Sequence, residues 1–159
     1  MLTLAALAQS TALAGVSLFG ARPDVVFLLV AVWAFLRGPA EGAVWAFIGG
    51  VLLDVLSGGP LGGFTLALLL AALLVGQQWG RELGSTAFQL VLLVLVAGFL
   101  SHVVLLLAMS ATGYPVNWQY GLSHVAAPSA VLNALLALTV HPLLSWLDRR
   151  IRPEGFTLQ

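Results

Sequence analysis

One long apolar run, TAFQLVLLVLVAGFLSHVVLLLAMSA at 86–111, contains no Asp, Glu, Lys or Arg. It belongs to a chain of 159 residues that is 60% hydrophobic and only 8% charged, whereas globular domains are about 25% charged. A soluble core cannot hide so much apolar surface, so the sequence predicts an integral membrane protein. The length allows about five to six spans of about 20 residues each, within one membrane domain covering 1–159.

Turn residues and Arg divide the chain into six expected spans, and the fold class is therefore an all-α, six-helix membrane bundle. The predicted spans are 2–20, 23–36, 42–56, 61–79, 86–111 and 128–147. We read 2–20 as a retained span, because it lacks the positive n-region of a signal peptide. The second and third spans reach only about 21–23 Å, less than a hydrocarbon core of about 30 Å. We expect either that longer helices flank them or that the membrane thins around them.

Arginine distribution predicts the orientation. Six spans with cytoplasmic termini leave Arg22 alone on the outside, and the other arginines inside: Arg37, Arg81, Arg149, Arg150 and Arg152. This asymmetry is what the positive-inside rule expects. We therefore expect a multi-pass protein of a bacterial inner membrane. The formal net charge is zero, which argues against a nucleic-acid partner.

Asp54 lies in an otherwise uncharged stretch, where a charge at mid-bilayer costs about 2.5–3.5 kcal/mol on an insertion scale. One interpretation is structural: the carboxylate caps backbone N–H groups of the turn Ser57-Gly58-Gly59, or pairs with an internal Arg. The other places Asp54 in a partner-binding or conformational site, because intramembrane carboxylates are often functional.

Small residues recur every four positions ahead of Asp54. Gly42, Ala46 and Gly50 form a small-xxx-small stripe of the kind that lets another helix backbone approach closely. We interpret the stripe as a partner-binding or packing surface. On this interpretation Gly50→Leu impairs assembly more than folding.

Polar residues elsewhere have mostly structural interpretations. Asp24, which follows Arg22 and Pro23, suits the start of a helix, and a pairing of Arg22 with Asp54 is the alternative. His102 is expected to bond across a helix interface as a neutral imidazole. The chain shows no nucleophile–base pair, carboxylate dyad, metal motif or phosphate loop, so no catalytic residue, metal or cofactor is expected.

A longer motif carries a family resemblance. The sequence L-L-x-D-x-x-S-G-x-P-L-G is present as Leu52, Leu53, Asp54, Ser57, Gly58, Pro60, Leu61 and Gly62. Together with Pro-Asp at 23–24 and the Arg-Gly turn at 37–38, it resembles the rod shape-determining protein MreD family. The resemblance is close over 22–74 and extends to the size and span number of the whole chain.

That resemblance implies a non-catalytic scaffold of the bacterial elongation machinery. Its implied partners are the bitopic protein MreC, a RodA-like glycosyltransferase, a penicillin-binding transpeptidase and the cytoplasmic MreB-like filament. The family also resembles the six-helix substrate-binding subunits of energy-coupling-factor transporters, which keeps a small-molecule-binding subunit as an alternative function. A third possible function is a proton or ion channel that uses Asp54 and His102. Two isolated titratable groups make a poor relay for such a channel.

Overall fold

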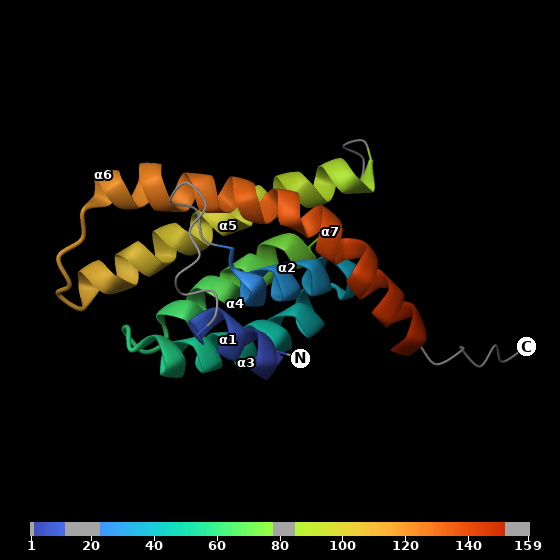
Figure 1. Cartoon of the computed structure of the whole chain (residues 1–159), viewed down its shortest axis with the longest axis horizontal. Coiled ribbons are helices and arrows are strands. Elements are labelled where there is room, and N and C mark those ends of the chain that lie inside the picture. Colours follow the sequence, from blue (N-terminus) through green and yellow to red (C-terminus); the bar gives the residue numbers. More distant parts are fainter. Residues whose placement is uncertain (1, 12–22, 78–84, 152–159) are drawn as a thin grey trace, which may run out of the picture.

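The computed structural model describes residues 2–11, 23–77 and 85–151, and every regular element in these ranges is helical. The elements are α1 (Leu2–Thr11), α2 (Val25–Arg37), α3 (Pro39–Ser57), α4 (Gly63–Gly76), α5 (Thr86–Ala111), α6 (Trp118–Tyr120), the π-helical turn η1 (Gly121–Ala126) and α7 (Ala127–Ile151). Figure 1 shows α1 and α3 on one side, α5 and α7 on the other, and α2 and α4 between them.

In the part of the chain that the structure describes, three helical stretches are long and apolar enough to cross a membrane: Pro39–Ser57, Thr86–Ala111 and the continuous run Trp118–Ile151. Apolar helices α2 and α4 are shorter, with 13 and 14 residues, which corresponds to about 20 Å each. The chain is thus an all-helical membrane protein. The expected number of six spans stays a prediction, because parts of the ranges 2–20 and 61–79 lie outside the described residues.

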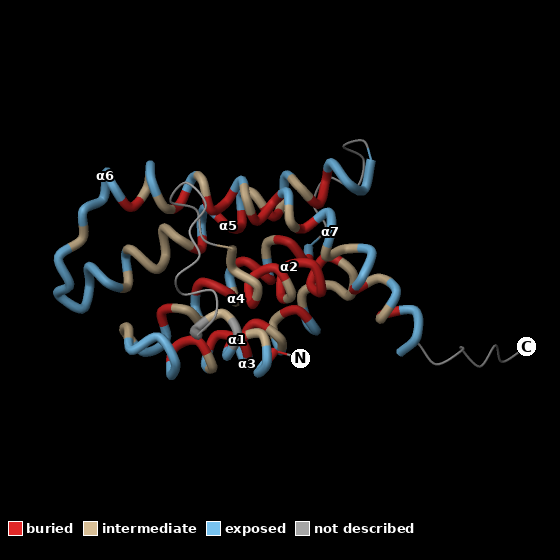
Figure 2. Tube along the Cα trace, in the orientation of Figure 1, coloured by how far each residue is buried: buried red, intermediate tan, exposed pale blue. Residues whose placement is uncertain are grey.

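The central helix is α2, which contacts α1, α3, α4, α5 and α7. Nine of its 13 residues are buried, and Figure 2 shows it as the most continuously buried segment. A helix that is apolar on all sides suits such a position, because it has no polar face to turn towards water. The longer helices α3, α5 and α7 surround it, so a helix too short for the bilayer lies inside the bundle.

Large apolar side chains face outwards, as expected where lipid is the solvent. On α3 the exposed face consists of Val44, Phe47, Ile48, Val51 and Val55. Four small residues of the same helix, Gly42, Ala46, Gly49 and Gly50, are buried. Thus the large apolar side chains of α3 face outwards, and its buried small residues pack against the other helices of the bundle.

The connection between α2 and α3 is much shorter than expected. Only Gly38 separates the two helices, with a φ of +91° that favours glycine. Pro39 occupies the first turn of α3, where its missing N–H has no intrahelical role. The predicted loop 37–41 is therefore wrong, since α3 begins at Pro39 and not at 42.

The predicted loop 112–127 is also largely helical. The side chain of Asn117 accepts a hydrogen bond from Tyr120 N at 3.1 Å and begins α6. In η1 the N–H of Ala127 bonds to the carbonyl of Leu122, a π-type step. This wider turn lets the helix continue through Pro128, which cannot donate a backbone hydrogen bond. Pro128 therefore lies within the Trp118–Ile151 helix and does not begin it.

Candidate functional site

Asp54 caps the neighbouring helix of its hairpin. Its carboxylate accepts hydrogen bonds from Phe64 N at 2.9 Å, Thr65 N at 3.2 Å and the Thr65 hydroxyl at 2.6 Å. The side chain is only 4% exposed. These N–H groups belong to the first turn of α4 and have no intrahelical acceptor. Asp54 is thus a backbone cap as one interpretation expected, but of α4 and not of the Ser57-Gly58-Gly59 turn.

The rest of the motif builds the turn between α3 and α4. Ser57 Oγ accepts from Gly59 N at 3.3 Å and donates to the Asp54 carbonyl at 3.5 Å. Gly58 and Gly62 adopt φ values of +64° and +90°, which L side chains rarely adopt. The carbonyl of Pro60 accepts from Gly63 N. Every one of these contacts lies within the hairpin itself.

The small-residue stripe packs against the chain's own helices. A Cβ added at Gly50 would lie 2.4 Å from Thr65 Cα on α4, and one at Gly42 would lie 2.4 Å from Ala34 Cβ on α2. Ala46, between them, is fully buried. These contacts hold the bundle together. We therefore expect Gly50→Leu to impair folding, and not assembly more than folding as the sequence suggested.

Asp24 begins α2, as its sequence position suggested. Its Oδ1 accepts from Phe27 N at 2.9 Å and from Gln9 Nε2 at 3.0 Å, while Gln9 Oε1 accepts from Val26 N at 3.0 Å. On α7, Asn133 accepts from Asp24 N at 3.0 Å. Asp24 therefore joins α1, α2 and α7. The alternative pairing of Arg22 with Asp54 involves a residue outside the described part of the chain.

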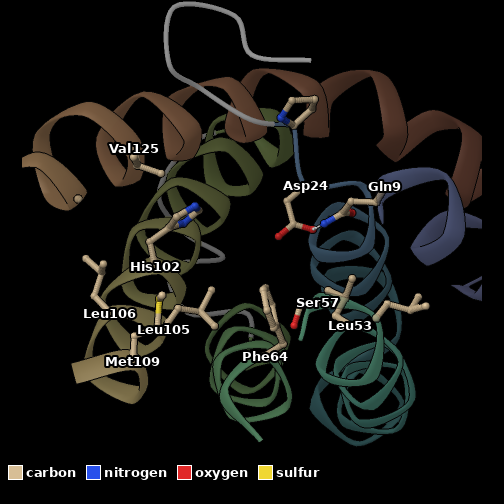
Figure 3. Close-up of a pocket in the computed structure, with 13 residues that line it drawn as sticks. Gln9, Asp24, Leu53, Ser57, Phe64, His102, Leu105, Leu106, Met109 and Val125 are labelled. Carbon is tan, nitrogen blue, oxygen red and sulfur yellow. Dashed lines mark hydrogen bonds between the residues drawn. The ribbon is translucent and has the colours of Figure 1, made fainter. Parts of the chain in front are cut away.

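His102 lies on α5 and faces Asp24 across a gap (Figure 3). Its Nδ1 lies 2.8 Å from the carbonyl oxygen of Gly98. A carbonyl oxygen can only accept, so Nδ1 carries the hydrogen, and Nε2 of the neutral ring is an acceptor. The predicted bond across a helix interface is wrong, because Gly98 belongs to the same helix.

The gap is a cavity of about 570 Å³, which we call the Asp24 recess. Its polar lining consists of Gln9, Asp24, Ser57 and His102. Apolar side chains from α3, α4, α5 and η1 complete the walls, among them Leu53, Phe64, Leu105, Leu106, Met109 and Val125. The recess lies at the N-terminal end of α2, where this short helix leaves space beside the longer α5.

At the opposite end, a charged cluster ties α2 to α7. Arg37 forms an ion pair with Asp148 and a 3.4 Å contact with Glu41. The Arg37 guanidinium also lies 5.5 Å from the Trp33 ring centroid, and Trp33 stacks on Trp45 at 4.6 Å. No group of three or more metal-ligating side chains occurs among the residues that the structure describes.

Sequence reasoning missed Gln9, Asn133 and Asp148. Gln9 and Asn133 bond to residues of other helices, and Asp148 lies 111 positions from Arg37. A polar residue on an otherwise apolar span was the available signal for Gln9 and Asn133, because such a residue needs a partner inside the bundle. Asp148 lies just beyond the predicted span 128–147, next to Arg149 and Arg150, and gave no such signal.

Comparison with known proteins supports the resemblance carried by the motif. The family model described as "rod shape-determining protein MreD" matches residues 1–151. No curated protein and no solved structure matches this chain, so the likeness to transporter substrate-binding subunits stays a prediction. A match over nearly the whole length, together with the Asp54–Gly62 hairpin, shows that the chain belongs to the MreD family of rod shape-determining proteins.

Proposed function

We propose that this protein is a non-catalytic scaffold of the elongation machinery in a bacterial inner membrane. It binds an MreC-like bitopic protein and helps couple an MreB-like filament to a RodA-like glycosyltransferase and a penicillin-binding transpeptidase. Membership of a shape-determining family carries the proposal. The positive-inside rule supports cytoplasmic termini, which places the basic end of α7 inside and the Asp24 recess on the outer side.

Two surfaces are available to partners. One is the outward face of α3, with Val44, Phe47, Val51 and Val55 exposed, which suits a transmembrane helix. The other is the Asp24 recess, whose volume of about 570 Å³ suits a few inserted side chains. We infer that the bitopic partner uses the recess, because polar and apolar groups converge there on one cavity.

A small-molecule-binding subunit is the second candidate, and the same cavity favours it. Four polar side chains and an apolar wall are features of ligand sites. The two functions differ in what accompanies the protein. A scaffold co-purifies with a bitopic protein and wall synthases, whereas a transporter subunit co-purifies with an ATPase module.

Affinity purification from native membranes, followed by identification of the bound proteins, tests the proposal. Recovery of a bitopic partner and wall synthases is the expected result. Recovery of an ATPase module without them would contradict the scaffold function. Depletion of the protein should also turn rod-shaped cells round, and rods that keep their shape would count against the role.

A further inference from the structure

The two carboxylate oxygens of Asp24 have different surroundings. Oδ1 accepts hydrogen bonds from Phe27 N and Gln9 Nε2. Oδ2 accepts none from any residue within the described ranges, and Asp24 lines the recess. Figure 3 shows the carboxylate between Gln9 and the open space that His102 faces. One carboxylate oxygen is therefore left for an incoming group.

Two of the other polar groups of the recess, Ser57 and His102, also present acceptors. Both polar ends of the Gln9 amide are already bonded, to Asp24 and to Val26 N. Ser57 directs its hydroxyl hydrogen to the Asp54 carbonyl, and a neutral His102 ring with its hydrogen on Nδ1 has an acceptor at Nε2. A ligand that fits this arrangement must donate hydrogen bonds.

Charge leads to the same ligand chemistry. Asp24 forms no ion pair with an Arg among the residues that the structure describes, and Arg37 forms its ion pairs at the other end of α2. The N-terminus of α2 offsets part of the negative charge. A carboxylate among apolar walls still gains most from a cation that replaces water.

We propose that the Asp24 recess binds a cationic N–H donor, the ammonium or guanidinium group of a Lys or Arg side chain carried by the partner protein. This inference rests on the proposed scaffold function. The charged head pairs with Asp24 Oδ2 and donates to His102 Nε2. The aliphatic stem of the same side chain packs on Phe64, Leu105 and Met109, as long cationic side chains do against apolar surfaces.

Charge-selective labelling tests the chemistry, because the chain contains no native cysteine. Ser57→Cys places a thiol in the recess, and Thr112→Cys places an exposed thiol beyond the C-terminal end of α5. Both variants are treated with methanethiosulfonates carrying an ammonium or a sulfonate. We expect the preference for the ammonium reagent to be about tenfold greater in Ser57→Cys than in Thr112→Cys. Adding Asp24→Asn should abolish this difference.

Protection from labelling tests occupancy. Hexylammonium should slow the modification of the thiol in Ser57→Cys, whereas hexanol and hexanoate, which have the same chain length, should not. Equal reactivity of the two reagents, or equal protection by hexanol, would overturn the proposal. Arg22→Gln should leave the preference unchanged. If the preference for the ammonium reagent appears only in the Arg22→Gln variant, Arg22 itself occupies the recess in the wild-type chain. That result would also overturn the proposal.

Co-purification tests the source of the cation. Asp24→Asn should lower recovery of the bitopic partner at least tenfold. Glu41→Gln, which removes the same charge at the opposite end, should leave recovery unchanged. If the wild-type protein recovers no bitopic partner, the proposed function fails. If wild type and Asp24→Asn recover it equally, only the present inference fails.

Discussion

Asp54 and Asp24 are two acidic side chains in the same half of the bundle, with opposite environments. Asp54 accepts three hydrogen bonds from the α4 N-terminus and is almost completely buried. Asp24 uses one oxygen for two bonds and leaves the other at a cavity. The conspicuous carboxylate of the family motif is thus a structural one, and the less conspicuous one faces the available space.

The difference shows how to interpret a charge within a membrane domain. A carboxylate whose two oxygens both accept bonds from the protein contributes to folding, because its loss leaves backbone donors unpaired in lipid. A carboxylate with one unused oxygen that faces an accessible cavity can bind a further ligand. Counting bonds per oxygen separates the two cases, whereas position in the sequence does not.

The largest loss of stability should come from removing the carboxylate of Asp54. Asp54→Ala leaves the amides of Phe64 and Thr65 without acceptors, which should cost about 3 kcal/mol or more of unfolding free energy. Denaturant titration of purified protein, followed by tryptophan fluorescence, measures it. Ser57→Ala loses only two long bonds, 3.3 Å to Gly59 N and 3.5 Å to the Asp54 carbonyl, and serves as control. Similar stabilities of the two variants would show that Asp54 does not act as the cap.

The second-largest loss of stability should come from disturbing the close packing of α3 on α4 at Gly50. Gly50→Ala places a Cβ 2.4 Å from Thr65 Cα, and the backbone must shift, at about 2 kcal/mol. Gly59→Ala is the matched control, since its Cβ would meet only Ser57 Oγ at 3.5 Å. The same titration compares them. A stable Gly50→Ala protein that fails to recover its partners would restore the stripe as a partner surface.

A third acidic residue sharpens the comparison, because Asp148 is buried with a cation beside it. A double-mutant cycle of Arg37→Gln and Asp148→Asn should give a coupling energy of about 1 kcal/mol. The ion pair is partly exposed on the Arg37 side, at 21%, which limits its strength. Additive effects of the two substitutions would show that the pair contributes nothing to the α2–α7 contact.

The smallest change in stability is expected at Asp24. Asparagine is as good a helix N-cap as aspartate and its oxygen can keep the bonds to Phe27 N and Gln9. Asp24→Asn should therefore alter the unfolding free energy by less than about 0.5 kcal/mol, while it impairs partner recovery. A loss of stability comparable to that of Asp54→Ala would remove the distinction between the two residues.

Much of the architecture was predictable where the chain is uniformly apolar. The span 86–111 coincides with α5, Thr86–Ala111, because polar residues bound it on both sides. Predicted boundaries were wrong next to two prolines. Pro39 lies inside the first turn of α3, and Pro128 follows a π-helical turn that shifts the hydrogen-bond register. Neither local geometry can be read from residue identity alone.

The site was predictable only in part. Capping by Asp24 follows from its position next to a helix start, and a cap role for Asp54 follows from the cost of an unpaired charge. The identity of the capped helix depended on the α3–α4 hairpin geometry. The recess brings together Gln9, Asp24 and His102, which belong to three different helices. Nothing in the sequence around each of these residues indicates that they lie close together.

The continuous helix Trp118–Ile151 has a mechanical consequence. Its 34 residues extend over about 50 Å, more than the thickness of the hydrocarbon core. Val125 borders the recess near one end, and Asp148 is clamped by Arg37 near the other. The helix bends along its course (Figure 1), and Pro142 lies inside it, so one continuous helix links the recess to the Arg37–Asp148 ion pair. Any tilt imposed on the end of the helix beside the recess must be absorbed by that bend or transmitted to the end that carries Asp148.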